Sequence, residues 1–253
     1  MSRIPRAVAG LLLVNIVVFA AGFLLPDGRG PLVAAGAFWF PANDHFGVWQ
    51  AVSYMFLHAD FGHIFFNMFA LVSFGPVLGR EWGAPRFLLF YFLCGVGAGL
   101  IQTGINWTEF NGLHARLVAA GLTPSDISSM LATGGGAIPS DPAIKAVLIE
   151  LYGLYASPML GASGAVYGLL VAFGFLHPNA TLSLMFVPVP IAAKFFIPGL
   201  LLLDLLSGVT GFSIFGASIA HFAHLGGAAI GFILMLLWRN RDRGPVMEGQ
   251  TFR

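Results

Sequence analysis

The sequence predicts an all-α polytopic membrane protein, a single membrane domain of 253 residues with six membrane-spanning helices. Three observations predict this fold class. Hydrophobic residues make up 57% of the chain and charged residues only 9%, whereas about a quarter of the residues in a soluble domain are charged. The apolar residues form runs near the ~20 residues that a helix needs to cross a bilayer. Lys and Arg gather beside alternate ends of these runs.

The first three predicted spans are closed by charged residues or by residues that end helices. The first span, 7–25, is followed by Pro26 in a Pro-Asp-Gly turn. The second span, 60–79, ends before Arg80. The third span, 87–105, follows the same short polar connection, so the second and third spans are expected to run antiparallel.

The last three predicted spans have similar limits. The fourth span, 159–176, is followed by a His-Pro-Asn turn. The fifth span, 194–211, begins with a lysine, and the sixth span, 218–238, is followed by Arg239 and a short tail, 239–253, that is rich in arginine. Polar turns and basic ends of this kind are typical of transmembrane helices.

The positive charges predict the orientation of the spans, because Lys and Arg concentrate in cytoplasmic loops. Six spans with both termini cytoplasmic place nine positive residues inside, namely Arg3, Arg6, Arg80, Arg86, Lys194, Arg239, Arg241, Arg243 and Arg253. Three then lie outside, namely Arg29, Arg116 and Lys145. The first run also fits a cleaved secretory signal peptide, but its removal would place the Arg-rich tail outside, against the charge bias.

Two connections stand out by their length or their prolines. Residues 106–158 form an external loop insertion, in which 109–120 and 125–131 are predicted as short helices. Residues 182–193 are apolar but interrupted by two prolines, which favours a re-entrant or interfacial connection over a seventh span. The single Cys94 forms no internal disulfide, and a net charge of +1 gives no reason to expect nucleic acid as a partner.

Polar residues within spans are costly there and are candidates for function. The set comprises His63, Asn67, Ser163, Tyr167, Asp204, His221 and His224. At 1.5 Å per helical residue, Ser163 lies roughly 6 Å below the outer boundary, His224 roughly 9 Å and Asn67 roughly 10 Å. Three spans thus deliver a hydroxyl, an imidazole and a carboxamide to one layer.

This set fits nucleophilic catalysis. A serine hydroxyl needs an adjacent imidazole to accept its proton, and the oxyanion that forms needs fixed hydrogen-bond donors. Ser163 is the candidate nucleophile and His224 the candidate base, while Gly161 and Gly164 leave room for a substrate backbone. Alternative interpretations stay open: Gly-Ala-Ser-Gly is also a packing sequence of membrane helices, and His221 with His224 could form a proton relay or half of a metal site.

Three motifs together resemble the rhomboid family of intramembrane serine proteases. They comprise His58 and His63-Ile64-Phe65-Phe66-Asn67, then Gly161-Ala162-Ser163-Gly164 with Tyr167, and finally Ala223-His224-Leu225-Gly226-Gly227 with Gly231. The resemblance covers residues 49–239, and one departure is Gln50, where the family often has arginine.

The resemblance implies a rhomboid-like bundle that cleaves membrane-anchored proteins near the outer side of the bilayer. It implies a dyad of Ser163 and His224 without a carboxylate, and His63 and Asn67 at the oxyanion. It also implies that Tyr167 packs on the ring of His224, which leaves Asp204 a structural role. The expected partners are transmembrane protein substrates and the lipid bilayer, with no cofactor and no metal, and the expected location is a bacterial plasma membrane.

Two alternatives to a protease remain. One is a catalytically inactive rhomboid-like binding protein, against which the presence of both Ser163 and His224 argues. The other is a transporter that uses the three intramembrane histidines as a proton or metal path, which lacks the acidic ligands that such a path usually needs. Covalent labelling by a fluorophosphonate distinguishes the protease from both.

Overall fold

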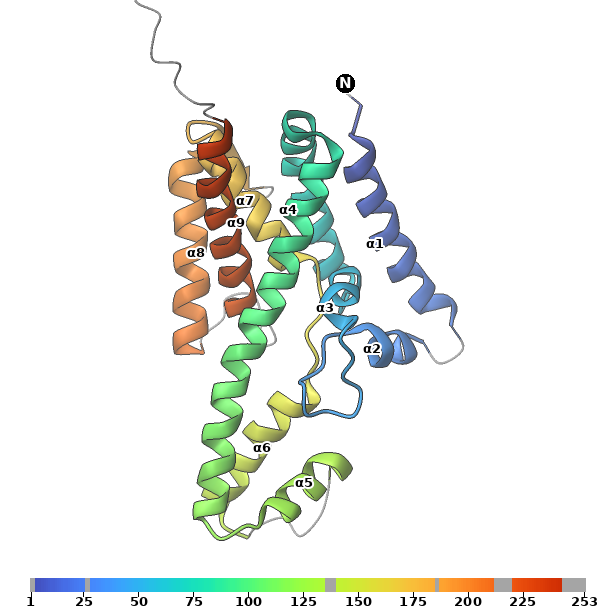
Figure 1. Ribbon diagram of the computed structural model, residues 1–253, viewed down its shortest axis with the longest axis vertical. Helices are drawn as coiled ribbons and strands as arrows, with labels where there is room; N and C mark the ends of the chain where they lie inside the picture. The colour runs from blue at the N-terminus through green and yellow to red at the C-terminus, as the bar shows by residue number, and fades with distance from the viewer. Residues whose placement is uncertain (1–2, 26–27, 135–139, 185–186, 212–219, 243–253) are drawn as a thin grey trace, which may run out of the picture.

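The computed structural model describes residues 3–25, 28–134, 140–184, 187–211 and 220–242. Its elements, in chain order, are α1 (Arg6–Leu24), α2 (Gly30–Gly36), α3 (Gln50–Ser53), the 3-10 turn η1 (Tyr54–Phe56), α4 (Phe61–Ala119), α5 (Pro124–Thr133), α6 (Pro142–Ala156), α7 (Ser163–Leu176), β1 (Thr181–Leu184), β2 (Val187–Ala192), α8 (Ala193–Thr210) and α9 (His221–Asp242). The long helices form a bundle, and α5 and α6 lie beyond one end of it (Figure 1).

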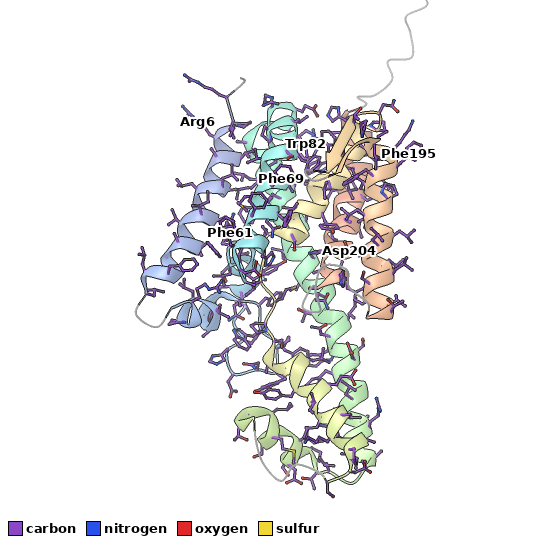
Figure 2. All side chains as sticks on the ribbon, turned by 180° about the vertical axis from the view of Figure 1, so that it is seen from behind. Arg6, Phe61, Phe69, Trp82, Phe195 and Asp204 are labelled. Carbon is purple, nitrogen blue, oxygen red and sulfur yellow. The ribbon has the colours of Figure 1, made fainter. Side chains whose placement is uncertain are left out.

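Helix α4 contains the second and third predicted spans. Its backbone leaves helical geometry at Gly83, where φ is 72°, a conformation that glycine adopts without a Cβ clash. The first half rises from Phe61 to Trp82 at the upper end of the bundle, and the second half descends from there (Figures 1 and 2). The runs 60–79 and 87–105 are therefore both helical and are joined by a tight reversal.

Four helices in the described part of the chain, α1, α4, α8 and α9, are long and apolar enough to cross a membrane, and α7 is a shorter apolar helix. Because α4 holds two predicted spans, helices cover all six runs. The first turn of α1 and the last turn of α9 lie at the same end of the bundle (Figure 1). The predicted start of the sixth span, 218, and the tail beyond 242 lie outside the described residues.

The fourth span begins later than predicted. Residues 159–162 are not helical, because Met159 pairs with Phe38 through two backbone hydrogen bonds of 2.8 and 2.9 Å and Gly161 has a φ of 123°. Helix α7 therefore starts at Ser163. The correction places this serine in the first turn of the helix, not one turn inside it.

Helix α7 occupies the centre of the bundle. It contacts α4, α8 and α9, and its buried residues include Leu169, Ala172 and Phe173. A helix that is apolar on all sides is expected to be buried on all sides. The central position of α7 lets α9 approach one of its faces while α4 covers another.

Within the predicted insertion 106–158, the helix expected at 109–120 is not a separate helix, since α4 continues without interruption to Ala119. The predicted helix 109–120 is thus the end of α4, the predicted helix 125–131 is present as α5, and α6 was not predicted. The reason is a second hydrophobic cluster, in which Leu117, Ile127 and Leu151 are buried together. This burial extends α4 past the apolar run.

The connection 182–193 is an antiparallel hairpin of β1 and β2, in register at Thr181 with Ala192 and Leu182 with Ile191. The prediction that it is not a seventh span agrees with this structure. Residues 188 and 190 of β2 are prolines. A two-stranded sheet tolerates them because each strand has one edge without a hydrogen-bond partner, and a missing N–H on that edge breaks no hydrogen bond.

Candidate active site

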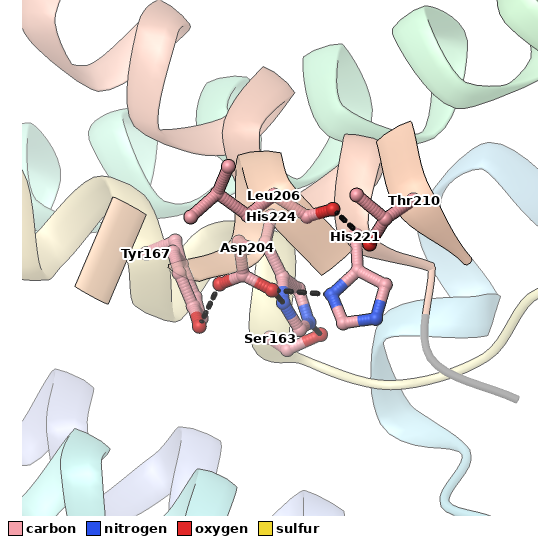
Figure 3. Close-up of polar contacts among 7 residues, drawn as sticks. All are labelled: Ser163, Tyr167, Asp204, Leu206, Thr210, His221 and His224. Carbon is pink, nitrogen blue, oxygen red and sulfur yellow. Dashed lines mark hydrogen bonds and ion pairs between the residues drawn. The ribbon is translucent and has the colours of Figure 1, made fainter. Parts of the chain in front are cut away.

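Ser163 and His224 meet between α7 and α9. The Ser163 Oγ and the His224 Nε2 are 2.9 Å apart and share a hydrogen bond (Figure 3). Both residues are partly buried, so the hydroxyl is shielded yet reachable. A nucleophile and a base within about 2.6–3.2 Å have the geometry that proton transfer requires.

The backbone around Ser163 is fixed from the preceding loop. The Gly161 N–H donates to the Tyr54 carbonyl at 2.9 Å, and the Tyr54 hydroxyl donates to the Gly95 carbonyl at 2.7 Å. Ser163 is the first residue of α7, and the first N–H groups of a helix have no partner within it. These N–H groups and the positive end of the helix dipole favour a negative charge beside Ser163.

Glycines bring the backbones of α7 and α9 into contact. A Cβ at Gly227 would overlap the carbonyl of Gly164, and a Cβ at Gly231 would lie 2.9 Å from the Gly168 Cα. Glycine is therefore needed at both positions of α9 for this approach. The close crossing sets the distance between the two helices on which Ser163 and His224 stand.

His63 lies against the loop before Ser163. Its backbone N–H is capped by the Asp60 carboxylate at 2.8 Å, and its Nδ1 accepts from the Ala59 N–H at 3.3 Å. A neutral imidazole that accepts at Nδ1 carries its proton on Nε2. That Nε2 points at Gly161, where an added Cβ would lie only 2.6 Å from it, so His63 offers a donor beside the loop that leads to Ser163.

Asn67 is buried one turn further along α4. Its side-chain amide donates to the His63 carbonyl at 3.0 Å, which uses one of its two N–H groups. Among the described residues, no hydrogen bond joins Asn67 to Ser163 or His224. The bond to His63 fixes the Asn67 side chain on the same face of α4 as the His63 ring.

His58 supports the ring of His63 from the loop before α4. The two rings are 5.0 Å apart and nearly perpendicular. His58 is buried, and within the described chain neither ring nitrogen has a hydrogen-bond partner. Burial, with a smaller contribution from His63, lowers the pKa of His58 to about 3, so this ring is neutral at physiological pH.

Asp204 of α8 lies among Tyr167, His221 and His224. Its Oδ1 accepts from the Nδ1 of His221 at 2.6 Å and from the Nδ1 of His224 at 3.2 Å. The Tyr167 hydroxyl donates to its Oδ2, and the Tyr167 ring stacks on the His224 ring with centroids 4.2 Å apart. Figure 3 shows the carboxylate between these groups. The expected dyad therefore has a carboxylate beside it.

The pattern in the sequence that signals this contact is the cost of a carboxylate within an apolar helix. Asp204 is the one acidic residue of α8, and it needs donors from neighbouring helices. Tyr167 and the two histidines are the donors that the adjacent helices supply. The ligand atoms of Asp204, His221 and His224 also lie within 4.8 Å of one another, as in a metal site, but the hydrogen bonds of Asp204 to the two histidines already explain the cluster.

Gln50, at a position where the rhomboid family often has arginine, forms a neutral hydrogen-bond network with the loop between α2 and α3. It is fully buried. Its Oε1 accepts from the Trp39 N–H at 3.2 Å, and its Nε2 donates to the His45 carbonyl at 2.6 Å. The loop is therefore held by hydrogen bonds to its own backbone, without an ion pair at this position.

Comparison with known proteins identifies the family of the chain. The family model described as the rhomboid domain matches residues 45–241, which include every site residue named above. The chain belongs to the rhomboid family. It is thus an integral, multi-pass membrane protein of a family that includes proteases.

Several rhomboid relatives are similar over much of the chain. The RHOMBOID-like protein 12, mitochondrial, of Arabidopsis thaliana is 35% identical over 70% of this chain and 43% of its own length. The Rhomboid protein 1, mitochondrial, of Saccharomyces cerevisiae is 28% identical over 78% of this chain and 45% of its own. The Rhomboid-like protease 3 of Toxoplasma gondii is 25% identical over 38% of each.

This rhomboid chain spans less than half the length of the first two of these relatives. Both are named as mitochondrial proteins. The comparisons therefore support an integral membrane location and do not support the expected bacterial plasma membrane.

Proposed function

We propose that this rhomboid protein is an intramembrane serine endopeptidase. The observation that carries the proposal is the 2.9 Å hydrogen bond between the Ser163 Oγ and the His224 Nε2. It joins a hydroxyl at the start of the buried helix α7 to an imidazole in the first turn of α9. A packing role for the Gly-Ala-Ser-Gly sequence accounts for the glycines but not for this bond.

The reaction follows from these positions. The Ser163 Oγ attacks the carbonyl carbon of the scissile peptide bond while its proton passes to the His224 Nε2. When the tetrahedral intermediate collapses, the C–N bond breaks and the imidazolium returns that proton to the leaving amine. Water then attacks the acyl carbon and gives a proton to His224, which passes it to the Ser163 Oγ as the ester C–O bond breaks. A carboxylic acid and free Ser163 are released.

The donors around Ser163 stabilise the oxyanion. We assign this role to the first N–H groups of α7, which have no partner within the helix, and to the Nε2–H of His63, which lies beside Gly161. The second N–H of Asn67 completes the set. Such donors are most effective where water is largely excluded.

The substrate is a protein anchored in the membrane, cleaved near the outer side of the bilayer. In this arrangement six helices cross the membrane with both termini cytoplasmic, as the charge bias supports. Ser163 then lies at the outer end of α7. A peptide bond near the outer end of a transmembrane segment reaches this level, whereas one at the bilayer centre does not.

The test uses the purified full chain in liposomes with a model protein that has one transmembrane segment. The wild type is expected to release two fragments whose masses add up to that of the substrate plus one water. Ser163→Ala is expected to release none while it keeps the thermal stability of the wild type. Equal cleavage by both proteins would refute the proposal, as would the absence of cleavage of any membrane-anchored substrate by the wild type.

A further inference from the structure

Asp204 has a position that a purely structural residue does not need. It lies on α8, is 6% exposed, and directs one carboxylate oxygen at the imidazole that faces Ser163. We infer that Asp204 is a positioning residue that holds His224 in the tautomer and orientation in which its Nε2 accepts the Ser163 proton. This inference rests on the proposed peptidase function and adds a third member to the dyad.

The tautomer follows from hydrogen-bond chemistry. A carboxylate is only an acceptor, so the His224 Nδ1 at 3.2 Å from it must be the donor. A neutral imidazole carries one proton, which leaves the Nε2 with a lone pair. That lone pair faces the Ser163 Oγ at 2.9 Å. The opposite tautomer would present an N–H to Ser163 and could not act as its base.

The carboxylate is itself fixed from two sides. The Tyr167 hydroxyl donates to the Oδ2, and the His221 Nδ1 donates to the same Oδ1 that faces His224. Three donors from α7 and α9 therefore hold the carboxylate. When His224 takes the Ser163 proton, it becomes an imidazolium beside a fixed negative charge in a partly dry site, where the attraction is larger than in water.

A structural role makes a different prediction. In that case Asp204 only ties α8 to α7 and α9. His221 makes the shorter bond to the same carboxylate, 2.6 Å against 3.2 Å for His224, and it also joins α8 to α9. If tying the helices together were the purpose, His221→Ala, which removes the shorter of the two bonds between α8 and α9, would lower thermal stability and activity together. If the tautomer of His224 is the purpose, a change of Asp204 lowers kcat even in protein that keeps the thermal stability of the wild type.

The kinetic experiment compares the wild type, Asp204→Asn and His221→Ala on the model substrate in liposomes. Asn has the size of Asp but lacks its charge. We expect Asp204→Asn to lower kcat by about 10²- to 10⁴-fold, the scale seen when the acid behind a catalytic histidine is neutralised, and to change KM by less than about threefold. His221→Ala, which leaves the bonds of Asp204 to His224 and Tyr167 in place, is expected to lose at least about tenfold less kcat than Asp204→Asn. Comparable losses in both variants, or full kcat in folded Asp204→Asn, would overturn the inference.

The spectroscopic experiment reads the tautomer without reference to activity. Nitrogen-15 NMR of histidine-labelled protein in micelles, at a pH where His224 is neutral, is expected to show its proton on Nδ1. Asp204→Leu, which offers no acceptor, is expected to move a large fraction of that proton to Nε2. A wild type with the proton on Nε2 would overturn the inference even if the Asp204 variants failed to fold.

The two proposals fail in different ways. A wild type that cleaves no substrate would refute the peptidase, and the tautomer of His224 would still be measurable. A wild type that cleaves its substrate but carries the His224 proton on Nε2 would retain the peptidase and remove Asp204 from its mechanism.

Discussion

Valine at Gly227 tests the close crossing of α7 and α9, and with it the origin of the Ser163–His224 distance. A Cβ at this position would lie 2.6 Å from the Gly164 carbonyl carbon and even closer to its oxygen, whereas ordinary contact begins near 3.4 Å. The two backbones must therefore separate by about 1 Å, because neither neighbour is a flexible side chain. Misplacement of about 1 Å at a catalytic centre can cost ~10²-fold in rate.

We therefore expect Gly227→Val to lose about 10²-fold or more in kcat, although it alters neither Ser163 nor His224. Gly199→Val is the matched control, since Gly199 also lies in an apolar helix but a Cβ there would meet nothing within 4 Å. Cleavage in liposomes gives the rates, and thermal unfolding shows that both variants are folded. A folded Gly227→Val protein with wild-type activity would refute the argument from close packing.

Three further predictions concern the histidines and Asn67. His224→Ala should eliminate labelling by a fluorophosphonate while His221→Ala retains most of it, and the reverse pattern would make His221 the base. Asn67→Ala should lower kcat by about 10²-fold or somewhat less with little change in KM; an unchanged kcat with a raised KM would make Asn67 a binding residue. The pKa of His58 lies near 3 in the folded protein and is about 6.5 in the unfolded protein. The unfolded state therefore binds more protons below pH 6.5, and the free energy of unfolding decreases as the pH is lowered. Between pH 6.5 and 5 His58 accounts for about 1.7 kcal/mol of that decrease, so thermal unfolding of His58→Leu should depend less on pH, and identical pH profiles would contradict this.

The spans and the Ser–His pair could be predicted because their signals are local. Apolar runs of the right length set the helices, and small and polar residues at fixed intervals placed Ser163 and His224 on facing helices. The start of α7 could not be predicted in this way. It depends on the pairing of Met159 with Phe38 and on the bond of the Gly161 N–H to the Tyr54 carbonyl, which are contacts with the segment between α2 and α4.

Two other features depend on contacts between segments far apart in the sequence. The extension of α4 to Ala119 requires α5 and α6 to cover Leu117. The apolar run 87–105 does not predict that these two helices pack there. The role of Asp204 depends on the rotation of α8 about its axis, which directs the carboxylate at α9 and not at lipid. Apolar periodicity is too weak in a helix with lipid on one side and protein on the other to define that rotation.

The central claim is that Ser163 is an activated nucleophile. The most direct measurement is labelling of the wild-type protein in detergent with a fluorophosphonate, followed by digestion and mass spectrometry of the modified peptide. The account predicts one adduct, on Ser163, and its loss in Ser163→Ala and His224→Ala. An adduct on another residue, or none on the folded wild type, would contradict it.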